Sequence, residues 1–352
     1  MNGALVYEDY LNLVKKNKIL NIIDLNSQIQ PASVDLSLSR ECYEIKTSFL
    51  SPKNKVRDKL RKISLEKFNL KNSKIFKKNK TYIVKLNEKL NLNNSIKGHC
   101  NPKSSTGRLN IFCRTILDYC DEYEKIPQNY KGNIFLEITS RSFDVKFTEG
   151  DKLNQMRLVN KTNNYLNDNK LQNIHKTKSL IFSKKNNIIE NGLKVSVDLS
   201  SDNKICAYES KLVSSYINFS KINFYDSSKY WTPLKPNNKS LIIEKDKFYI
   251  LKSKEKIRIP NYLAGEMKAY DTGIGDFRVH YAGFFDPGFG DPNGSFAVLE
   301  VKTNELPFII EDGQIIARIK YEKLNKKTSM VYGSNIKSNY QNQKLALSKH
   351  FK

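Results

Sequence analysis

The stretch Tyr82-Ile-Val-Lys85 returns 167 residues later as Tyr249-Ile-Leu-Lys252. Other short matches follow in the same order at shifts of 163 or 167: Ser33–Ser37 with Ser196–Ser200, Glu88 with Glu255, Gly98 with Gly265, Leu136–Ile138 with Leu299–Val301, and Gly150 with Gly313. Ordered matches at nearly constant spacing indicate two copies of one fold, and the period is too long for a solenoid. The chain therefore reads as a tandem domain duplication.

Strand-like patterns dominate both copies. Short apolar runs such as Tyr82–Val84, Asn110–Phe112 and Asn133–Ile138 recur between turn residues. Many short strands with few helices are typical of an all-β sandwich or barrel. In Gln30–Ser37, alternation predicts a strand, with Val34 and Leu36 on one face and Asp35 on the other.

Helical signals are few. Val6, Tyr10, Leu13 and Val14 form one apolar helical stripe with a stop at Asn17. Residues 51–80 are very basic, and we expect them on the surface. The Asn- and Lys-rich segment 166–190 is predicted to be a polar linker between a first domain, 1–165, and a second domain, 191–352.

The composition limits the function classes. The net charge of +24 favours a polyanionic partner. However, the lysines are spread along the chain among asparagines, so compositional drift explains the charge better than a nucleic-acid groove. No apolar run approaches the ~20 residues of a membrane span. The five cysteines and four histidines show no metal-ligand spacing. We expect a soluble, reduced, cytoplasmic protein without specific nucleic-acid binding.

One turn stands out chemically. Lys103-Ser-Ser-Thr-Gly-Arg108 places cations on either side of two serines, a threonine and a glycine. Such a turn can offer backbone N–H groups, hydroxyls and a guanidinium to an anionic ligand, although an ordinary polar loop is the alternative. The candidates are Lys103, Ser104, Ser105, Thr106, Gly107 and Arg108.

The copies differ where chemistry would occur. The second copy has Tyr270–Gly275 at the place of this turn, without the serine pair or arginine. It has instead Val279-His-Tyr-Ala-Gly-Phe-Phe-Asp-Pro-Gly-Phe-Gly290, an Asp-Pro-Gly turn among aromatics, where the first copy has the acidic Leu117–Glu124. The two halves are therefore predicted to complement each other.

Two glutamates lie in apolar strands. Glu137 shares a strand face with Phe135, and Glu300 shares one with Val298. Loss of hydration on an apolar strand raises a carboxyl pKa and suits general acid–base catalysis. A glutamate on the solvent-facing rim is the alternative for each.

Together these residues resemble a known family. Gln30–Leu36, Asn101–Leu109, Val279–Gly290 and Ser338-Asn-Tyr-Gln-Asn-Gln343 look like the double-length form of bacterial dCTP deaminase, in the dUTPase-like superfamily. The resemblance implies a β-clip barrel in two copies. It also implies zinc-independent hydrolytic deamination of dCTP to dUTP and ammonia for dUMP and dTTP synthesis, with Mg²⁺ accompanying the triphosphate. A homo-oligomer, trimeric or pseudo-trimeric, is implied as well.

The resemblance also implies site residues. Ser104, Ser105 and Arg108 would hold the phosphates and position the base and water, and Glu300, or Glu137 in the first copy, would be the catalytic glutamate. The remaining nucleotide contacts would be Ala282, Asp286, Tyr332 and Gln343. This sequence departs from the family in having Asn339 where a lysine is expected and Phe284 where an arginine is expected. We hypothesise a composite site in which Ser104, Ser105 and Arg108 meet Asp286 and Glu300, within one chain or across an oligomer.

Two other functions remain open from the sequence. A dUTP pyrophosphatase, or a bifunctional deaminase–pyrophosphatase, has the same superfamily fold, but the chain has no glycine-rich C-terminal tail of the pyrophosphatase kind. A non-catalytic nucleotide- or nucleic-acid-binding module is the third possibility.

Overall fold

The computed structural model describes residues 2–160, 165–183, 188–268, 277–279, 283–303, 306–334 and 340–352. The first copy consists of β1 (Gly3–Ala4), α1 (Tyr7–Lys15), β2 (Ile19–Leu20), α2 (Leu25–Gln28), β3 (Val34–Ile45), α3 (Val56–Ile63), β4 (Ser64–Asn69), η1 (Leu70–Asn72), β5 (Lys74–Phe76), β6 (Thr81–Asn91), β7 (Ile96–Pro102), α4 (Ser104–Gly107), β8 (Ile111–Leu117), β9 (Lys125–Ile126), β10 (Lys131–Ser140), β11 (Val145–Phe147) and β12 (Lys152–Asn160).

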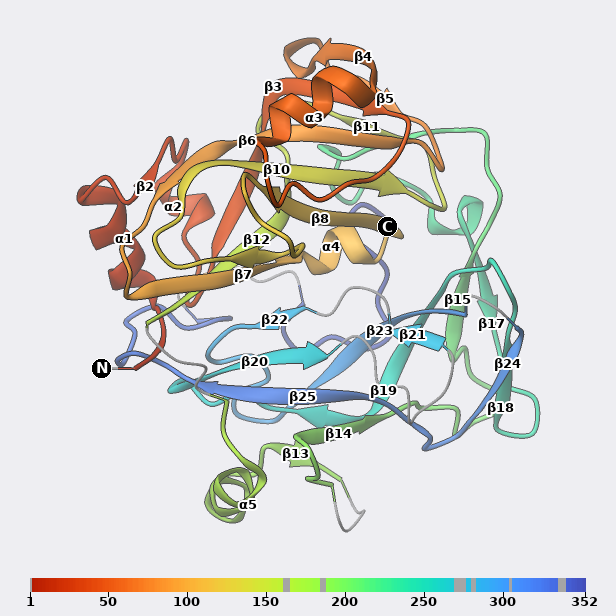
Figure 1. The fold of residues 1–352 in the computed structure, drawn as a ribbon. Coiled ribbons are helices and arrows are strands. Elements are labelled where there is room, and N and C mark those ends of the chain that lie inside the picture. The colour runs from red at the N-terminus through yellow and green to blue at the C-terminus, as the bar shows by residue number, and fades with distance from the viewer. Residues whose placement is uncertain are drawn as a thin grey trace.

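The second copy consists of α5 (Asp168–Thr177), β13 (Ile181–Phe182), β14 (Leu193–Ser196), β15 (Ala207–Ser210), β16 (Ile217–Asn218), η2 (Ser227–Lys229), β17 (Trp231–Leu234), β18 (Ser240–Ile243), β19 (Tyr249–Ile257), β20 (Leu263–Lys268), β21 (Phe277–Val279), β22 (Phe284–Phe285), β23 (Ser295–Thr303), β24 (Phe308–Glu311) and β25 (Ile315–Lys323). Figure 1 shows the two copies as two β bodies, one above the other. The predicted mainly β, duplicated fold is confirmed.

The central strands of each copy follow the same order. In the first copy the main path of a ten-stranded sheet runs β8-β10-β6-β3-β12-β7-β9, and β1, β2 and β4 pair with strands of this path. In the second copy the corresponding strands are divided between a sheet containing β19-β23 and a sheet running β14-β25-β20-β22. Glu137 on β10 lies opposite Ile83, and Glu300 on β23 lies opposite Ile250. The two glutamates therefore occupy equivalent positions.

One of the sequence matches is out of register. Glu88 accepts a hydrogen bond from the Ser37 backbone N–H at 3.0 Å, and Glu255 accepts one from the Ser196 backbone N–H at 2.9 Å. Ser37 is thus the equivalent of Ser196, so the alignment of Ser33–Ser37 with Ser196–Ser200 is wrong by four residues. An alternation of serine and apolar residues fits several alignments of the two strands. The hydrogen bond from a strand N–H to a buried carboxylate identifies the correct one.

Two predicted surface segments carry buried side chains. In the segment 51–80, Val56 and Leu60 of α3 pack with Ile83 and Phe135 in a small apolar cluster. This segment therefore lies only partly on the surface. The predicted linker 166–190 contains helix α5, and its β13 pairs with β19. The linker segment therefore packs on the second copy, while the domain boundaries stay a prediction.

A buried arginine joins the copies. Arg157 on β12 is fully buried and donates hydrogen bonds to three backbone carbonyls: Ala32 in the first copy at 3.1 Å, and Gly265 and Phe285 in the second at 3.0 and 3.3 Å. Nearby, His99 lies 3.3 Å from Glu266, its equivalent in the other copy at the 167-residue shift. A residue meets its own equivalent only close to the axis that relates two copies, so this axis passes near His99.

The chain end returns to the seam between the copies (Figure 1). Phe351 packs its ring 5.9 Å from the Trp231 ring, and the His350 imidazole lies 3.0 Å from the Phe219 carbonyl. The largest apolar core contains residues of both copies together with Phe351. This return path lays residues 340–352 across the site described below.

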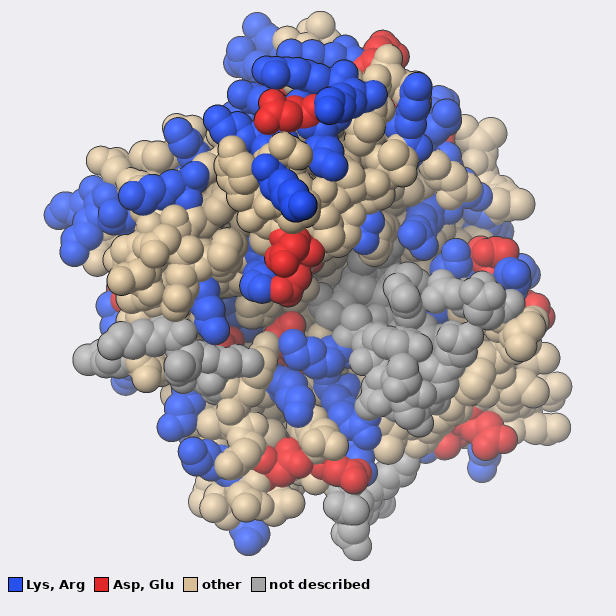
Figure 2. Space-filling model, in the orientation of Figure 1, with Lys and Arg blue, Asp and Glu red and all other residues tan. Residues whose placement is uncertain are grey.

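Lys and Arg side chains are distributed over both bodies on the face drawn in Figure 2, most densely over the upper one, with Asp and Glu interspersed. In the described parts of the chain, no helix is long and apolar enough to span a bilayer.

Candidate active site

A cavity of about 150 Å³ lies at the seam. The first copy contributes Gln30, Asp35, Lys103, Ser104, Ser105, Arg108 and Gln155; the second contributes Met267, Gly283, Phe284, Phe285, Asp286, Phe289, Val298, Glu300 and Tyr332; and the C-terminal segment contributes Tyr340, Gln343 and Lys349. The structure thus brings the two halves of the hypothesised composite site together within one chain.

Hydrogen bonds to the Leu153 carbonyl hold the Lys103–Arg108 turn in place. Residues Ser104–Gly107 form the short helix α4 between β7 and β8. The buried Thr106 hydroxyl donates to the Leu153 carbonyl at 2.8 Å, and the Lys103 N–H donates to the same carbonyl at 2.9 Å. Thr106 and Gly107 are therefore buried behind the cavity, while Lys103, Ser104, Ser105 and Arg108 line it.

The guanidinium of Arg108 is held by the C-terminal segment. It donates to Gln343 Oε1 at 2.7 Å and to the carbonyls of Ala346 and Leu347 at 3.1 and 3.4 Å. Its plane lies 3.9 Å from the centre of the Tyr340 ring. Arg108 Nε has no hydrogen-bond partner among the described residues. One donor of this charged group therefore has no acceptor within the described part of the chain.

Glu300 supplies an acid to the same cavity. Its side chain is almost fully buried, and this burial raises its pKa well above the ordinary value, with the Arg108 charge opposing the rise. Burial therefore favours the neutral form of this carboxyl, which can donate a proton, while its carboxylate form can accept one.

Asp286 is a second acid on this wall, with a side chain that is 11% exposed. Burial raises its pKa to about 6, while Arg157, whose Nη2 lies 3.5 Å away, opposes the rise. Asp286 starts a tight turn in which the Phe289 N–H donates to its carbonyl at 3.1 Å. Gly288 has φ +95°, and a Cβ there would lie 2.3 Å from the Val331 side chain, so the turn requires glycine.

One end of the cavity is cationic. Lys103 forms an ion pair with Asp35. Lys349 lies beside them, and its pKa is lowered by burial and then by the Lys103 charge. Two converging ammonium groups with one carboxylate between them leave positive charge, which suits a phosphate-bearing ligand.

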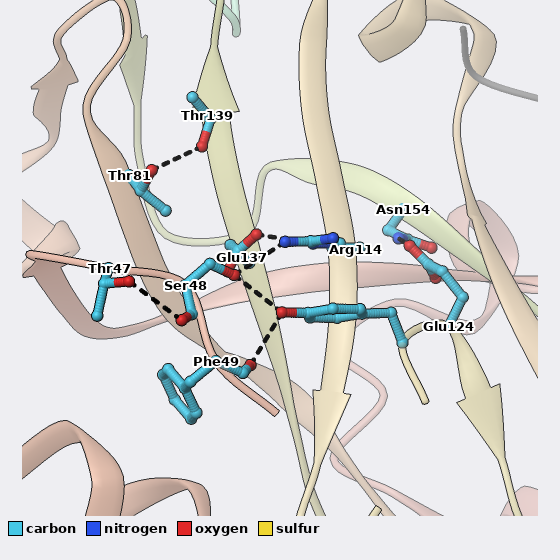
Figure 3. A network of polar contacts seen from close by, with 10 residues as sticks. Thr47, Ser48, Phe49, Thr81, Arg114, Glu124, Glu137, Thr139 and Asn154 are labelled. Carbon is cyan, nitrogen blue, oxygen red and sulfur yellow. Dashed lines mark hydrogen bonds and ion pairs between the residues drawn. The ribbon is translucent and has the colours of Figure 1, made fainter. Parts of the chain in front are cut away.

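Glu137 does not reach this cavity. Its carboxylate accepts a hydrogen bond from Arg114 Nε at 2.8 Å and another from the Ser48 hydroxyl, which itself lies 2.8 Å from the Tyr123 hydroxyl (Figure 3). The Arg114 guanidinium stacks 3.6 Å from the Tyr123 ring centre. The first-copy glutamate is thus enclosed in a network within its own body.

Two family models cover almost the whole chain. The model for the N-terminal domain of 2'-deoxycytidine 5'-triphosphate deaminase matches residues 1–162, and the model for the C-terminal domain matches residues 167–351. The chain belongs to the dCTP deaminase family. The resemblance noted from the sequence is confirmed, and membership makes the protein an enzyme rather than a binding module alone.

A solved structure agrees with this. The crystal structure of 2'-deoxycytidine 5'-triphosphate deaminase from Agrobacterium tumefaciens is 37% identical, with a TM-score of 0.88, over 93% of this chain and 99% of that chain. A comparison with curated proteins found no match.

The dCTP deaminase assignment leaves several site predictions untested. Lys103, Ser104, Ser105, Arg108, Asp286, Glu300, Tyr332 and Gln343 all line the cavity, and their individual roles stay predictions. Ala282, the 270–275 segment and Asn339 lie outside the described residues. In the described part of the chain, no group of three or more His, Cys, Asp or Glu residues could hold a metal ion.

Sequence reasoning missed several residues in or beside this dCTP deaminase family site. Asp35 was placed correctly on the polar face of its strand, but its ion pair with Lys103 joins residues 68 apart. Tyr340 lies within the quoted 338–343 motif but received no role. No local sequence pattern indicated Lys349 or Arg157. The position of Lys349 depends on the return of the C-terminal segment, and that of Arg157 depends on the contact between the copies.

Proposed function

We propose that the chain hydrolyses dCTP to dUTP and ammonia in the cavity shared by Arg108 and Glu300. The observation that carries the proposal is the meeting of these two residues, from different copies, in one cavity of a dCTP deaminase family member. The triphosphate, arriving with Mg²⁺ as part of the substrate, would lie against Lys103, Lys349 and the serine turn. The cytosine would lie among Phe285, Phe289 and Glu300.

The raised pKa of Glu300 suggests an order of proton transfers. Glu300 first gives its proton to the ring nitrogen next to the amino-bearing carbon, which makes that carbon more electrophilic. The resulting carboxylate then takes a proton from the water that attacks this carbon. The same acid gives this proton to the amino group, which leaves as ammonia. The hydroxyl on the ring carbon then returns its own proton to the Glu300 carboxylate as the carbonyl of dUTP forms. The balance is water plus dCTP giving dUTP plus ammonia, and positioned proton transfer of this kind contributes about 10²–10⁴-fold.

Arg108 has an electrostatic part in this scheme. Its charge opposes the raised pKa of Glu300, so it stabilises the carboxylate that forms after the first transfer. Its free Nε can also donate to the attacking water or to oxyanion character on the ring. Zinc is not needed in this scheme, because the carboxylate takes the proton from water. The product would feed dUMP and dTTP synthesis.

Incubation with dCTP and Mg²⁺ tests the proposal. We expect loss of cytosine absorbance, one ammonia per nucleotide and accumulation of dUTP, unchanged by a zinc-selective chelator. Pyrophosphate and dUMP without free dUTP would favour the bifunctional enzyme, and conversion of supplied dUTP alone, with dCTP untouched, would favour the pyrophosphatase.

A further inference from the structure

A second cleft lies between the two copies and shares no lining residue with the cavity of Arg108 and Glu300. Its volume is about 810 Å³. The first copy lines it with the β5–β6 turn and the end of β10, and the second copy lines it with the end of β15, the β18–β19 turn and β23. The Ser142 hydroxyl of the first copy donates to the Ser210 hydroxyl of the second at 3.1 Å, which joins the two sides.

The lining of this cleft is unbalanced in charge. Six cationic side chains face it against two acids, Glu209 and Asp246. The cations are Lys78, Arg141, Lys211, Lys245, Lys247 and Lys302. Glu209 pairs with Lys247 at 2.9 Å and Asp246 pairs with Lys302 at 3.7 Å. Within the described part of the chain, the other four cations have no carboxylate within ion-pair distance.

Lys302 is the most informative of these cations. Its side chain is only 13% exposed, whereas that of Asp246, its acidic partner, is 74% exposed and therefore well screened by water. Burial and then the like charges of Arg141 and Lys78 lower the Lys302 pKa. A half-buried ammonium that faces like charges is unfavourable in the absence of an anion. Compositional drift toward lysine explains exposed lysines, but it does not explain a half-buried one near an arginine from the other copy.

We propose that this cleft binds a polyphosphate-bearing anion between the two copies, at a site separate from the one that holds Arg108 and Glu300. The six cations and two acids leave four net positive charges, and a triphosphate group carries about four negative charges near neutral pH. The Ser210 hydroxyl, which accepts from Ser142, supplies its own O–H as a neutral donor among the cations. Glu300 and Lys302 lie two residues apart on β23 and so point to the same side of the strand. An anion here therefore binds next to the strand that carries the acid of the first cavity.

Titration calorimetry with inorganic tripolyphosphate, and separately with ATP, tests this proposal. We compare the wild-type chain with Lys302→Met and Arg141→Met, which remove one cleft cation from each copy, and with Lys204→Met, which removes an exposed lysine outside the cleft. We expect each cleft variant to bind about tenfold or more weakly, because each substitution removes a charged hydrogen bond to the anion. Lys204→Met should match the wild type.

Thermal unfolding provides the second measurement. Without added anion, Lys302→Met should unfold at the wild-type temperature or above it, since the substitution removes a desolvated, repelled charge. Tripolyphosphate should raise the midpoint of the wild type more than that of the variant. Equal affinity and equal stabilisation in the wild type, Lys302→Met and Arg141→Met would overturn the proposal.

The two ligands distinguish the source of the anion. Tighter binding of ATP indicates a nucleotide occupant, and tighter binding of tripolyphosphate indicates an inorganic one; binding of neither overturns the site. Deamination of dCTP by the same preparations is followed in parallel, so failure of this site and failure of the proposed reaction give separate results.

Discussion

Glu137 and Glu300 occupy the same position on equivalent strands, yet Glu137 is bound by Arg114 and Ser48 while Glu300 lines the cavity with Arg108. The two carboxyls therefore differ in the side chains that surround them and not in their positions on the strand. This difference leads to the first prediction.

Glu300→Gln should lower kcat for dCTP deamination by about 10²–10⁴-fold, because the amide can neither take the proton from water nor pass it on. Glu137→Gln is the matched control. It should keep kcat close to the wild type but lower the free energy of unfolding by about 1–3 kcal/mol, because Arg114 loses its charged acceptor. Steady-state kinetics and urea unfolding of both variants check this, and an inactive Glu137→Gln beside a fully active Glu300→Gln would reverse the assignment.

The ring of Tyr340 should matter more than its hydroxyl for substrate binding. The ring covers the Arg108 guanidinium at 3.9 Å, so Tyr340→Phe keeps the contact and Tyr340→Ala removes it. Loss of a cation–π contact at a buried site costs about 2 kcal/mol, which corresponds to a rise in KM of roughly thirtyfold for the alanine variant. Initial rates over a range of dCTP concentrations measure the effect, and equal KM values for the two variants would refute this role of the ring.

Glu124 should make stability pH-dependent. Burial raises its pKa to about 8, and the Thr115 hydroxyl and Asn154 amide, at 3.2 and 3.5 Å, only partly offset this. Since the folded-state pKa is raised above the unfolded value, this group stabilises the fold fully below about pH 4.5. The contribution is lost as the pH rises through about 8, at roughly 1.4 kcal/mol per unit of pKa difference.

Glu124→Gln removes this titration. The variant should match the wild type near pH 5 and exceed its unfolding free energy at pH 8.5, as urea unfolding at both values would show. The exposed Glu122→Gln should leave the pH profile unchanged. A wild-type profile that stays flat between pH 5 and 8.5 would contradict a buried, protonated Glu124.

Arg157→Lys should weaken the junction of the copies despite the conserved charge. The guanidinium donates to carbonyls of both copies, and a single ammonium cannot reach all three from one position. We expect a loss of about 3 kcal/mol in unfolding free energy, typical of a disrupted buried charge network. Calorimetric unfolding measures it, with Arg40→Lys, whose ion pair with Glu149 lies on the surface, as the control.

The sequence alone predicted the features that depend on local residue patterns. Alternation and turn residues predicted the strands, the Val6–Val14 stripe predicted α1, and the Asp286-Pro-Gly turn lies where the pattern placed it. The different motifs of the two copies led to the prediction of a composite site, and the cavity is lined by residues of both copies. These features depend on neighbouring residues and on the duplication, which a single sequence displays.

Other features depend on contacts between distant residues. The four-residue error at Ser33–Ser37 arose because the partner that sets the register, Glu88, lies far along the chain. Helix α5 was missed because its polar composition hides one buried face, which Leu171 marks. The closure of Arg108 by residues 343–347 follows from the return of the chain end, which no periodicity reveals.

The bonds of Arg157 bear on how a nucleotide reaches the cavity. The Arg157 guanidinium is hydrogen-bonded to the backbone of both bodies. A hinge opening between the bodies would therefore leave buried donors of this group without acceptors. Movement of residues 340–349 breaks the hydrogen bonds of this segment to Arg108, Ser105, Phe296, Asn223 and the turn at Gly288–Asp291, but it leaves the Arg157 junction intact. Loading and release by movement of residues 340–349 therefore keep all three donors of Arg157 paired. The rate of nucleotide exchange should then depend on this C-terminal segment while the two barrels stay fixed.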